Sequence, residues 1–281
     1  MSATTTVTRK GVRLCYDTLG NPANPPLLLI QGLGAQLVGW HPEFCARLAQ
    51  AGFYVIRHDN RDVGLSQKFP DTDYTLTDMA TDSSELIHAL GLPSAHIVGQ
   101  SMGGMIAQEI AITHPETVRS LTLIYSCAHP HHLLDIVTDR TNLPPARTRD
   151  EAIENFVQNE APAASPAYPH DDAWIRELGS LMYDRDYEPA ATERQLAAIY
   201  ASQDRRPALS SIGTPTAILH GDSDNLIDPA GAEELHHLIP GSTLTVYPGM
   251  GHSIPRELWD DVITEIRNNT KAGVARCPRD R

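Results

Sequence analysis

Six short, mainly apolar runs, separated by stretches with helical periodicity, limit the folds that this chain can adopt. Runs this short and continuous are typical of strands covered on both faces, as in a parallel sheet between two layers of helices. Strands are therefore predicted at residues 26–30, 53–56, 96–98, 121–124, 216–219 and 244–247.

The stretches between these runs have the pattern of amphipathic helices. Apolar residues from Leu76 to Leu90 fall on one face of a helix that Gly91 and Pro93 would end. Another helix is predicted after Pro255, a residue suited to a first helical turn. Strands that alternate with helices predict a doubly wound α/β fold with a mostly parallel sheet.

One stretch interrupts this alternation. Between about Cys127 and Ser210 no strand-like run occurs, and helices are predicted at 149–159, 174–182 and 191–201. An insertion between two strands, at the sheet edge where ligands bind, predicts a helical cap over a binding site. We expect residues 1–126 and 211–281 to form the core and residues 127–210 to form the cap.

The composition limits the partners. The 22 Lys and Arg against 35 Asp and Glu give a formal net charge of −13, which disfavours nucleic acids and anionic lipid surfaces. No apolar stretch approaches the ~20 residues of a membrane-spanning helix, and residues 1–16 lack the apolar segment of a signal peptide. The scattered cysteines at positions 15, 45, 127 and 277 favour reduced thiols. We expect a cytoplasmic protein with a small-molecule substrate, as a monomer or a homo-oligomer.

The motif Gly99-Gln100-Ser101-Met102-Gly103 follows the strand predicted at 96–98 and precedes an apolar helical stretch. A strand, a sharp turn and a helix around a G-x-S-x-G motif form a nucleophile elbow, which lifts the serine hydroxyl above the sheet. The helix N-terminus behind the serine supplies amide donors for an oxyanion. Ser101 is the predicted nucleophile, and a glycine-rich turn with an incidental serine is the alternative.

A serine nucleophile requires a base and an acid that orients the base. In a fold of this kind the acid and then the histidine follow the serine along the chain. The strand that precedes Gly221 leads into a loop with Asp222, Asp224 and Asp228, and the last predicted strand leads into the loop of His252. We expect His252 to be the general base and Asp224 to be the acid.

An oxyanion hole needs a second amide besides that of Met102, and this fold takes it from the loop after an early strand. That loop reads Gln31-Gly32-Leu33-Gly34, so the amide of Leu33 is the predicted donor. The two glycines would let the loop lie close to a substrate. A dinucleotide-binding loop is excluded, because the sixth position of a G-x-G-x-x-G pattern is Leu37 here.

Together these segments resemble a known family. Residues 31–34, 57–66, 99–104 and 248–252 are similar to those of actinobacterial α/β-hydrolase esterases of the aclacinomycin methylesterase type, which remove methyl esters from aromatic polyketides. The resemblance covers about residues 11–268 and is weak across the predicted cap. It implies the α/β-hydrolase fold, a triad of Ser101, Asp224 and His252, amide donors at Leu33 and Met102, and no cofactor. The family pattern G-x-x-D, matched from Gly221, favours Asp224 over the neighbouring carboxylates.

The predicted activity is hydrolysis of a carboxylic ester through an acyl-enzyme, with a methyl or small ester of an aromatic or polyketide compound as the implied substrate class. Two alternatives stay open. Carbon–carbon bond hydrolases of aromatic degradation have a similar Ser-Met-Gly-Gly motif and the same triad. Some proteins of this fold use the pocket for binding or cyclisation instead.

Other residues have weaker signals. Trp174 and Tyr200 are candidates for the substrate pocket, and the core of the cap is the alternative place for them. His129, His131 and His132 lie close together, but no carboxylate or cysteine except the neighbouring Cys127 completes a metal-binding set, so no metal is expected.

Overall fold

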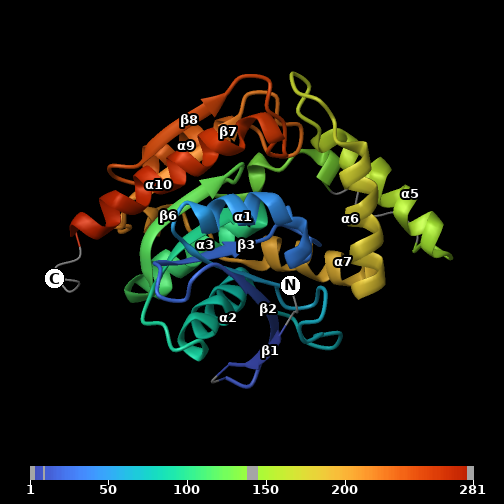
Figure 1. The fold of residues 1–281 in the computed structure, drawn as a ribbon, viewed down its shortest axis with the longest axis horizontal. Coiled ribbons are helices and arrows are strands. Elements are labelled where there is room, and N and C mark those ends of the chain that lie inside the picture. The colour runs from blue at the N-terminus through green and yellow to red at the C-terminus, as the bar shows by residue number, and fades with distance from the viewer. Residues whose placement is uncertain (1–3, 9, 138–144, 277–281) are drawn as a thin grey trace.

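The computed structural model describes residues 4–8, 10–137 and 145–276, which form one sheet with helices on both sides (Figure 1). Eight strands lie in the order β1-β2-β4-β3-β5-β6-β7-β8. They are β1 (Thr4–Val7), β2 (Arg13–Leu19), β3 (Pro26–Ile30), β4 (Tyr54–His58), β5 (Ala95–Gln100), β6 (Val118–Ile124), β7 (Thr216–Gly221) and β8 (Thr243–Tyr247).

All six predicted strands are confirmed as β3 to β8, and they pair in parallel. The sheet continues beyond β4 through β2 and β1, which pair antiparallel and were not among the predicted strands. The sequence of β2 mixes charged and apolar residues, and its burial varies along the strand, so it lacks the continuous apolar run of a central strand.

The helices are α1 (Pro42–Gln50), α2 (Leu76–Ala89), α3 (Met102–Thr113), α5 (Arg149–Glu160), α6 (Asp172–Arg185), α7 (Pro189–Ala201), α8 (Arg206–Leu209), α9 (Ala230–Leu238) and α10 (Trp259–Arg276). Short 3₁₀ turns occur at Leu37–Gly39, Pro115–Thr117, Pro130–His132, Ala161–Ala163 and Arg256–Leu258. Helix α2 begins with a capping box, in which Thr75 and Asp78 each accept from the other's backbone amide.

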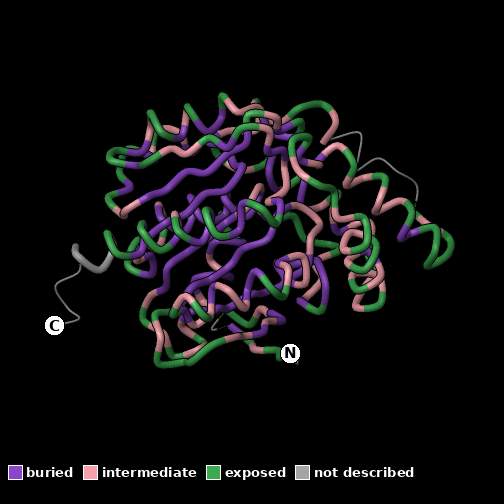
Figure 2. The backbone as a smooth tube through the Cα atoms, turned by 45° about the horizontal axis from the view of Figure 1, so that its top comes forward, coloured by how far each residue is buried: buried purple, intermediate pink, exposed green. Residues whose placement is uncertain are grey.

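The two faces of the sheet have separate apolar cores, and the alternation of side chains along β3 shows why. Leu28 and Ile30 pack with residues of α2, α3 and α9, whereas Leu27 and Leu29 pack with residues of α1 and α10. All four side chains have no exposed surface. Successive residues of a strand point to opposite faces, so a run of apolar residues is what a sheet covered on both sides requires. In Figure 2 the inner strands are correspondingly buried along their length.

Helices α5 to α8 lie between β6 and β7 along the chain, and α5 and α6 stand apart from the sheet in Figure 1. The helices predicted at 149–159, 174–182 and 191–201 are confirmed as α5, α6 and α7, which we call the cap helices. Residues 138–144 of the predicted cap, and residues 1–3 and 277–281 of the predicted core, lie outside the described residues. The boundaries between core and cap therefore stay a prediction.

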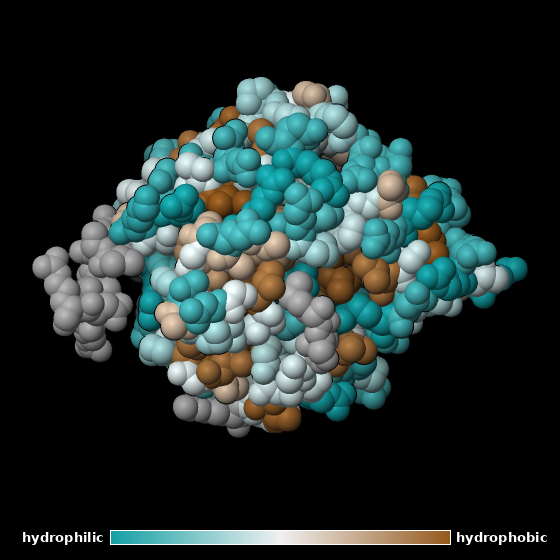
Figure 3. Space-filling model, in the orientation of Figure 1, coloured by the Kyte–Doolittle hydropathy of each residue, from teal (hydrophilic) through white to brown (hydrophobic). Residues whose placement is uncertain are grey.

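Three of the four cysteines, Cys15, Cys45 and Cys127, are buried free thiols, and Cys277 lies outside the described residues. None of the helices that the structure describes is both long enough and apolar enough to cross a membrane. On the face shown in Figure 3 apolar residues form several separate groups among polar ones, as is usual for a protein surface.

Candidate active site

Ser101 lies at the turn between β5, which ends at Gln100, and α3, which begins at Met102. Its backbone has φ 55° and ψ −125°, a conformation that a residue with a side chain rarely adopts. The turn is possible because glycines lie two positions before and two positions after the serine. A Cβ atom on Gly99 would lie 2.2 Å from the carbonyl oxygen of Gly103, and one on Gly103 would lie 2.3 Å from that of Ile30. The turn has the geometry of a nucleophile elbow.

Three loops at the carboxyl ends of strands bring Ser101, His252 and Asp224 together. The Nε2 atom of His252 is 2.9 Å from Oγ of Ser101, and its Nδ1 atom is 2.7 Å from Oδ2 of Asp224. At these distances hydrogen bonds connect the carboxylate of Asp224, the imidazole of His252 and the hydroxyl of Ser101 in a continuous chain. Such a chain can move the hydroxyl proton to the imidazole, whose positive charge the carboxylate then stabilises.

The carboxylate of Asp224 is buried and has a partner at each oxygen. Its Oδ1 atom accepts from the amides of Leu226 at 2.8 Å and Ile227 at 3.0 Å. Its Oδ2 atom faces His252 and also Nε2 of His220, which is 3.2 Å away. Burial by itself would raise the pKa of the Asp224 carboxyl, but the charges of the two histidines and their hydrogen bonds hold that pKa well below its usual range. The group is therefore a carboxylate at neutral pH.

The other two carboxylates considered for the acid have different contacts. Oδ1 of Asp222 accepts from the amide of Gly249 at 2.6 Å, so this side chain joins the loop of Asp224 to the loop that leads to His252. Oδ1 of Asp228 accepts from the amide of Ala230 at 2.9 Å, at the start of α9. Asp228 thus satisfies a free amide in the first turn of the helix, one residue before the N-cap Pro229.

The loop 31–34 lies directly beside the serine, since a Cβ atom on Gly32 would be 3.1 Å from Cβ of Ser101. Among the described residues, no protein acceptor takes a hydrogen bond from the amide of Leu33 or of Met102. Both amides are thus available to an oxyanion that forms next to Ser101.

Three polar side chains near the serine were not predicted from the sequence. Oε1 of Gln31 accepts from the amide of Gly32 at 3.2 Å and from Nε2 of Gln100 at 2.5 Å. The hydroxyl of Tyr125 donates to Oε1 of Gln100 at 2.5 Å. Gln100 occupies the variable second position of the serine motif, so the motif carried no signal for this chain of contacts.

Ser101 and His252 lie on a cavity of about 690 Å³ that residues of both the core and the cap helices line. Trp174 of α6, a pocket candidate from the sequence, is among them. Tyr200 is not, and its side chain is 55% exposed, which corrects the prediction for this residue. Its neighbour Ile199 is buried and lines the cavity instead. Successive residues of a helix point about 100° apart, so one position decides which of the two reaches the cavity.

The histidines of the segment 129–132 have a carboxylate neighbour that the sequence did not reveal. Oε2 of Glu234 in α9 lies 3.1 Å from Nε2 of His132, and one ligand atom of His131 lies within 4.8 Å of both. This corrects the expectation that no carboxylate is near. The guanidinium of Arg206 also lies 3.6 Å from Glu234, and its positive charge opposes a cation at this place.

The sheet order, the elbow and the cavity define a hydrolase of the α/β type, and comparison with known proteins agrees. The family model of the alpha/beta hydrolase fold matches residues 25–256, so this chain belongs to that family. Over 297 aligned residues the chain is 28% identical to the rhodomycin D methylesterase DauP of Streptomyces sp. (strain C5), with 95% of this chain and 97% of the relative covered. The resemblance to methylesterases expected from the sequence is thereby confirmed.

Solved structures share the fold at lower sequence identity. An esterase from Rhodococcus sp. ECU1013 superposes with a TM-score of 0.80 at 20% identity, with 97% of this chain and 99% of that chain covered. A meta-cleavage product hydrolase from Pseudomonas fluorescens IP01 superposes with a TM-score of 0.73 at 21% identity, with 96% of each chain covered. At these identities the two structures show a common fold and nothing more specific.

Proposed function

We propose that this carboxylic ester hydrolase works through an acyl-enzyme on Ser101, with His252 as general base and Asp224 as the acid that orients it. The observation that carries the proposal is the 2.9 Å contact between His252 Nε2 and Ser101 Oγ, at the end of the hydrogen-bond chain from Asp224. Asp224 keeps Nδ1 of the imidazole protonated, so that Nε2 is free to accept the serine proton.

The mechanism follows from these positions. His252 accepts the proton of Ser101 as Oγ attacks the ester carbonyl carbon, and the amides of Leu33 and Met102 stabilise the resulting oxyanion. The imidazolium then gives its proton to the departing alcohol, and an acyl-enzyme remains on Ser101. Water attacks the acyl-enzyme with the same help from His252 and the two amides, which releases the acid and restores the serine. No step requires a metal ion or an organic cofactor.

The substrate class that fits the cavity is a bulky, mainly apolar ester. A volume of about 690 Å³ lies within the range of sites for drug-sized ligands. Its lining includes the rings of Trp40, Phe44, Trp174 and Trp259, which suit an aromatic ring system. The methylesterase relatives act on rhodomycin D, so a methyl or other small ester of an aromatic compound is the proposed substrate. The free, buried thiols favour the cytoplasm as its location.

Labelling with a fluorophosphonate probe, followed by hydrolysis of an ester panel, tests the proposal. The wild-type chain should take up one label and hydrolyse a methyl ester of a bulky aromatic acid, and Ser101→Ala should do neither. Labelling that survives Ser101→Ala would disprove the assignment of the nucleophile. Turnover of a vinylogous diketone but of no ester would favour the carbon–carbon hydrolases, and no turnover of either would favour a binding protein.

A further inference from the structure

The loop that carries the Leu33 amide is held by a residue of the cap helices. The amide of Gly34 donates to Oε1 of Gln195 in α7 at 2.8 Å. Nε2 of the same side chain donates at 2.9 Å to the backbone oxygen of Arg61, in the loop that follows β4. Gln195 has no exposed surface, so both of its polar groups depend on these two partners. A buried side chain with both groups satisfied has one well-defined position.

Helix α7 also leaves the loop no room to move toward the cap. Gly34 has φ +70°, and a Cβ atom there would lie 2.6 Å from Oγ1 of Thr192, one turn before Gln195 in α7. The loop and the helix are therefore in direct contact at Gly34, next to the residue whose amide faces the serine.

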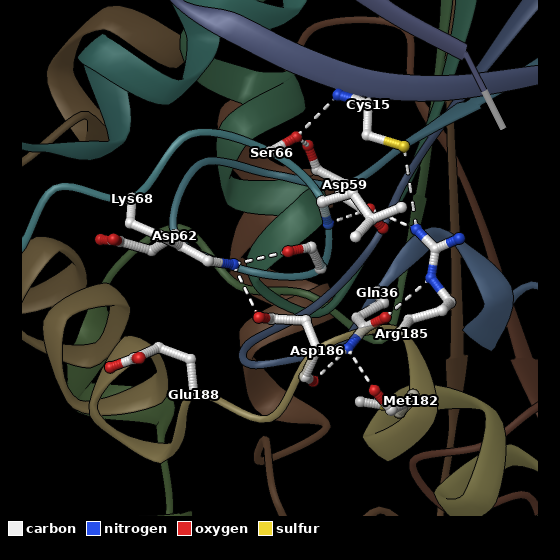
Figure 4. Close-up of polar contacts among 12 residues, drawn as sticks. Cys15, Gln36, Asp59, Asp62, Ser66, Lys68, Met182, Arg185, Asp186 and Glu188 are labelled. Carbon is white, nitrogen blue, oxygen red and sulfur yellow. Dashed lines mark hydrogen bonds and ion pairs between the residues drawn. The ribbon is translucent and has the colours of Figure 1, made fainter.

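A second cap helix contacts the same loop two residues further on. Nε2 of Gln36 donates to the backbone oxygens of Met182 at 2.9 Å and Asp186 at 3.0 Å, at the end of α6. Arg185 donates from Nε to Oε1 of Gln36 at 2.9 Å and forms an ion pair with Asp59 (Figure 4). The loop is thus attached to α7 at Gly34 and to α6 at Gln36.

Hydrogen bonds hold the two peptide groups that adjoin the peptide group of the Leu33 amide. Peptide groups are planar, so a hydrogen bond from one amide restricts the orientation of the whole group. Gln31 holds the group that contains the Gly32 amide, and Gln195 holds the group that contains the Gly34 amide. The group between them contains the amide of Leu33, whose direction is consequently set by its two neighbours.

We propose that Gln195 is a positioning residue, which aims the Leu33 amide at the oxyanion and so makes the oxyanion hole depend on the docked α7 helix. This inference rests on the proposed function, because it takes the Leu33 amide as an oxyanion donor. Loss of one such donor lowers kcat by about 10²- to 10³-fold in serine hydrolases. A donor that is displaced but present should cost less, roughly 10- to 100-fold in kcat.

The test compares Gln195→Met, which keeps the length of the side chain and removes both hydrogen bonds, with Gln195→Glu. A buried glutamic acid is protonated and can make both contacts, so Gln195→Glu should stay within about threefold of wild type. Ser202→Ala is the matched control, because Oγ of Ser202, after the end of α7, accepts from the core amide of Leu76 at 2.9 Å. That variant also removes one hydrogen bond between the end of this cap helix and the core, and the hydrogen-bond partners of Oγ, Leu76 and Ala198, lie outside the loop of Leu33.

Three measurements test the inference: steady-state kinetics on one ester, inhibition by an alkyl boronic acid, and thermal unfolding. The boronic acid forms a tetrahedral anion on Ser101 and reports on the oxyanion hole. Gln195→Met should lower kcat and boronic acid affinity by roughly 10- to 100-fold with KM within about threefold, and Ser202→Ala should change neither. A loss that appears in KM alone, or equally in Ser202→Ala, would mean a general role in cap docking and would overturn the inference.

The remaining outcomes are also decisive. If Gln195→Met does not fold, the result for Gln195→Glu decides. A loss of kcat of more than tenfold in Gln195→Glu, which lower pH does not restore by protonating the glutamate, would contradict the inference. The proposed function itself fails if Ser101→Ala retains activity or if the wild-type chain hydrolyses no ester, and neither result depends on Gln195, so the two failures are distinguishable.

Discussion

The imidazole of His220 contacts the carboxylate of Asp224: Nε2 lies 3.2 Å from Oδ2, and neither side chain has exposed surface. His220 is the last residue but one of β7, and Asp224 follows four positions later in the loop. The carboxylate oxygen that faces His252 is therefore also held from the side of the sheet. His220 was not among the residues singled out from the sequence, where it is one of 13 histidines.

Removal of the contact between His220 and Asp224 should lower kcat/KM although all three residues of the triad stay in place. We expect His220→Leu to lower kcat/KM by roughly 10- to 100-fold, since a hydrogen bond to a charged group contributes about 1.5–3 kcal/mol. His220→Gln, whose amide nitrogen can reach the same oxygen, should retain most of the activity. Equal losses in the two variants would contradict a role that depends on the donor.

The identity of the acid can be read from three amide substitutions. Asp224→Asn should lower kcat roughly 10⁴-fold, because an amide at this place favours the wrong tautomer of His252. Asp228→Asn should change stability by less than about 1 kcal/mol, since Asn also satisfies helix N-termini well. Asp222→Asn should keep an acceptor for Gly249 and lose little activity. A large loss of kcat in Asp228→Asn or Asp222→Asn would mean that Asp224 is not the acid.

The low pKa of Asp224 predicts how stability depends on pH. In the unfolded chain an aspartate has a pKa of about 3.9, and in the folded chain the value is lower. The ionised carboxylate therefore stabilises the fold above about pH 4, and this contribution is lost as the pH falls through the folded pKa. The free energy of unfolding from urea titrations should fall more steeply from pH 5 to pH 3 in wild type than in Asp224→Asn. Parallel curves would argue against the shift.

The ion pair between Arg185 and Asp59 should contribute more to the free energy of unfolding than the nearby ion pair between Lys68 and Asp186. Asp59 has no exposed surface, and its Oδ1 and Oδ2 atoms also accept from the amides of Leu37 and Leu65. Arg185→Met would leave this buried carboxylate without its cation, which should cost about 3–5 kcal/mol. Lys68→Met is the control, because the pair of Lys68 with Asp186 is only half-buried and should contribute less than about 1 kcal/mol. Urea denaturation measures both, and similar losses would refute the difference.

Trp174 and Tyr200 should respond differently to truncation, although both lie on cap helices. Trp174 lines the cavity, so Trp174→Ala should change relative kcat/KM between bulky and small esters by at least about tenfold. Tyr200 lies on the outer side of α7, so Tyr200→Ala should leave these ratios within about twofold. An unchanged ratio in Trp174→Ala would mean that the substrate does not reach this part of the cavity.

The parts of the fold that the sequence predicted are those that depend on local patterns. A buried strand such as β3 must be apolar on both faces, and an amphipathic helix such as α2 must repeat its apolar residues every turn. The order of Ser101, Asp224 and His252 along the chain could be read in the same way, because each follows a predicted strand. Strand β2 lacked such a pattern, and only its pairing with β4 makes it part of the sheet.

The tertiary structure decided which side chains meet across long separations in the chain. Gly34 and Gln195 are 161 positions apart, and no periodicity or motif relates them. The same is true of His132 and Glu234, and the choice between Ile199 and Tyr200 depended on the rotation of one helix against the core. Covalent geometry and hydrophobic periodicity act over a few residues and can be read from the sequence. Contacts between distant loops depend on how whole elements pack, and that packing is settled only when the complete core forms.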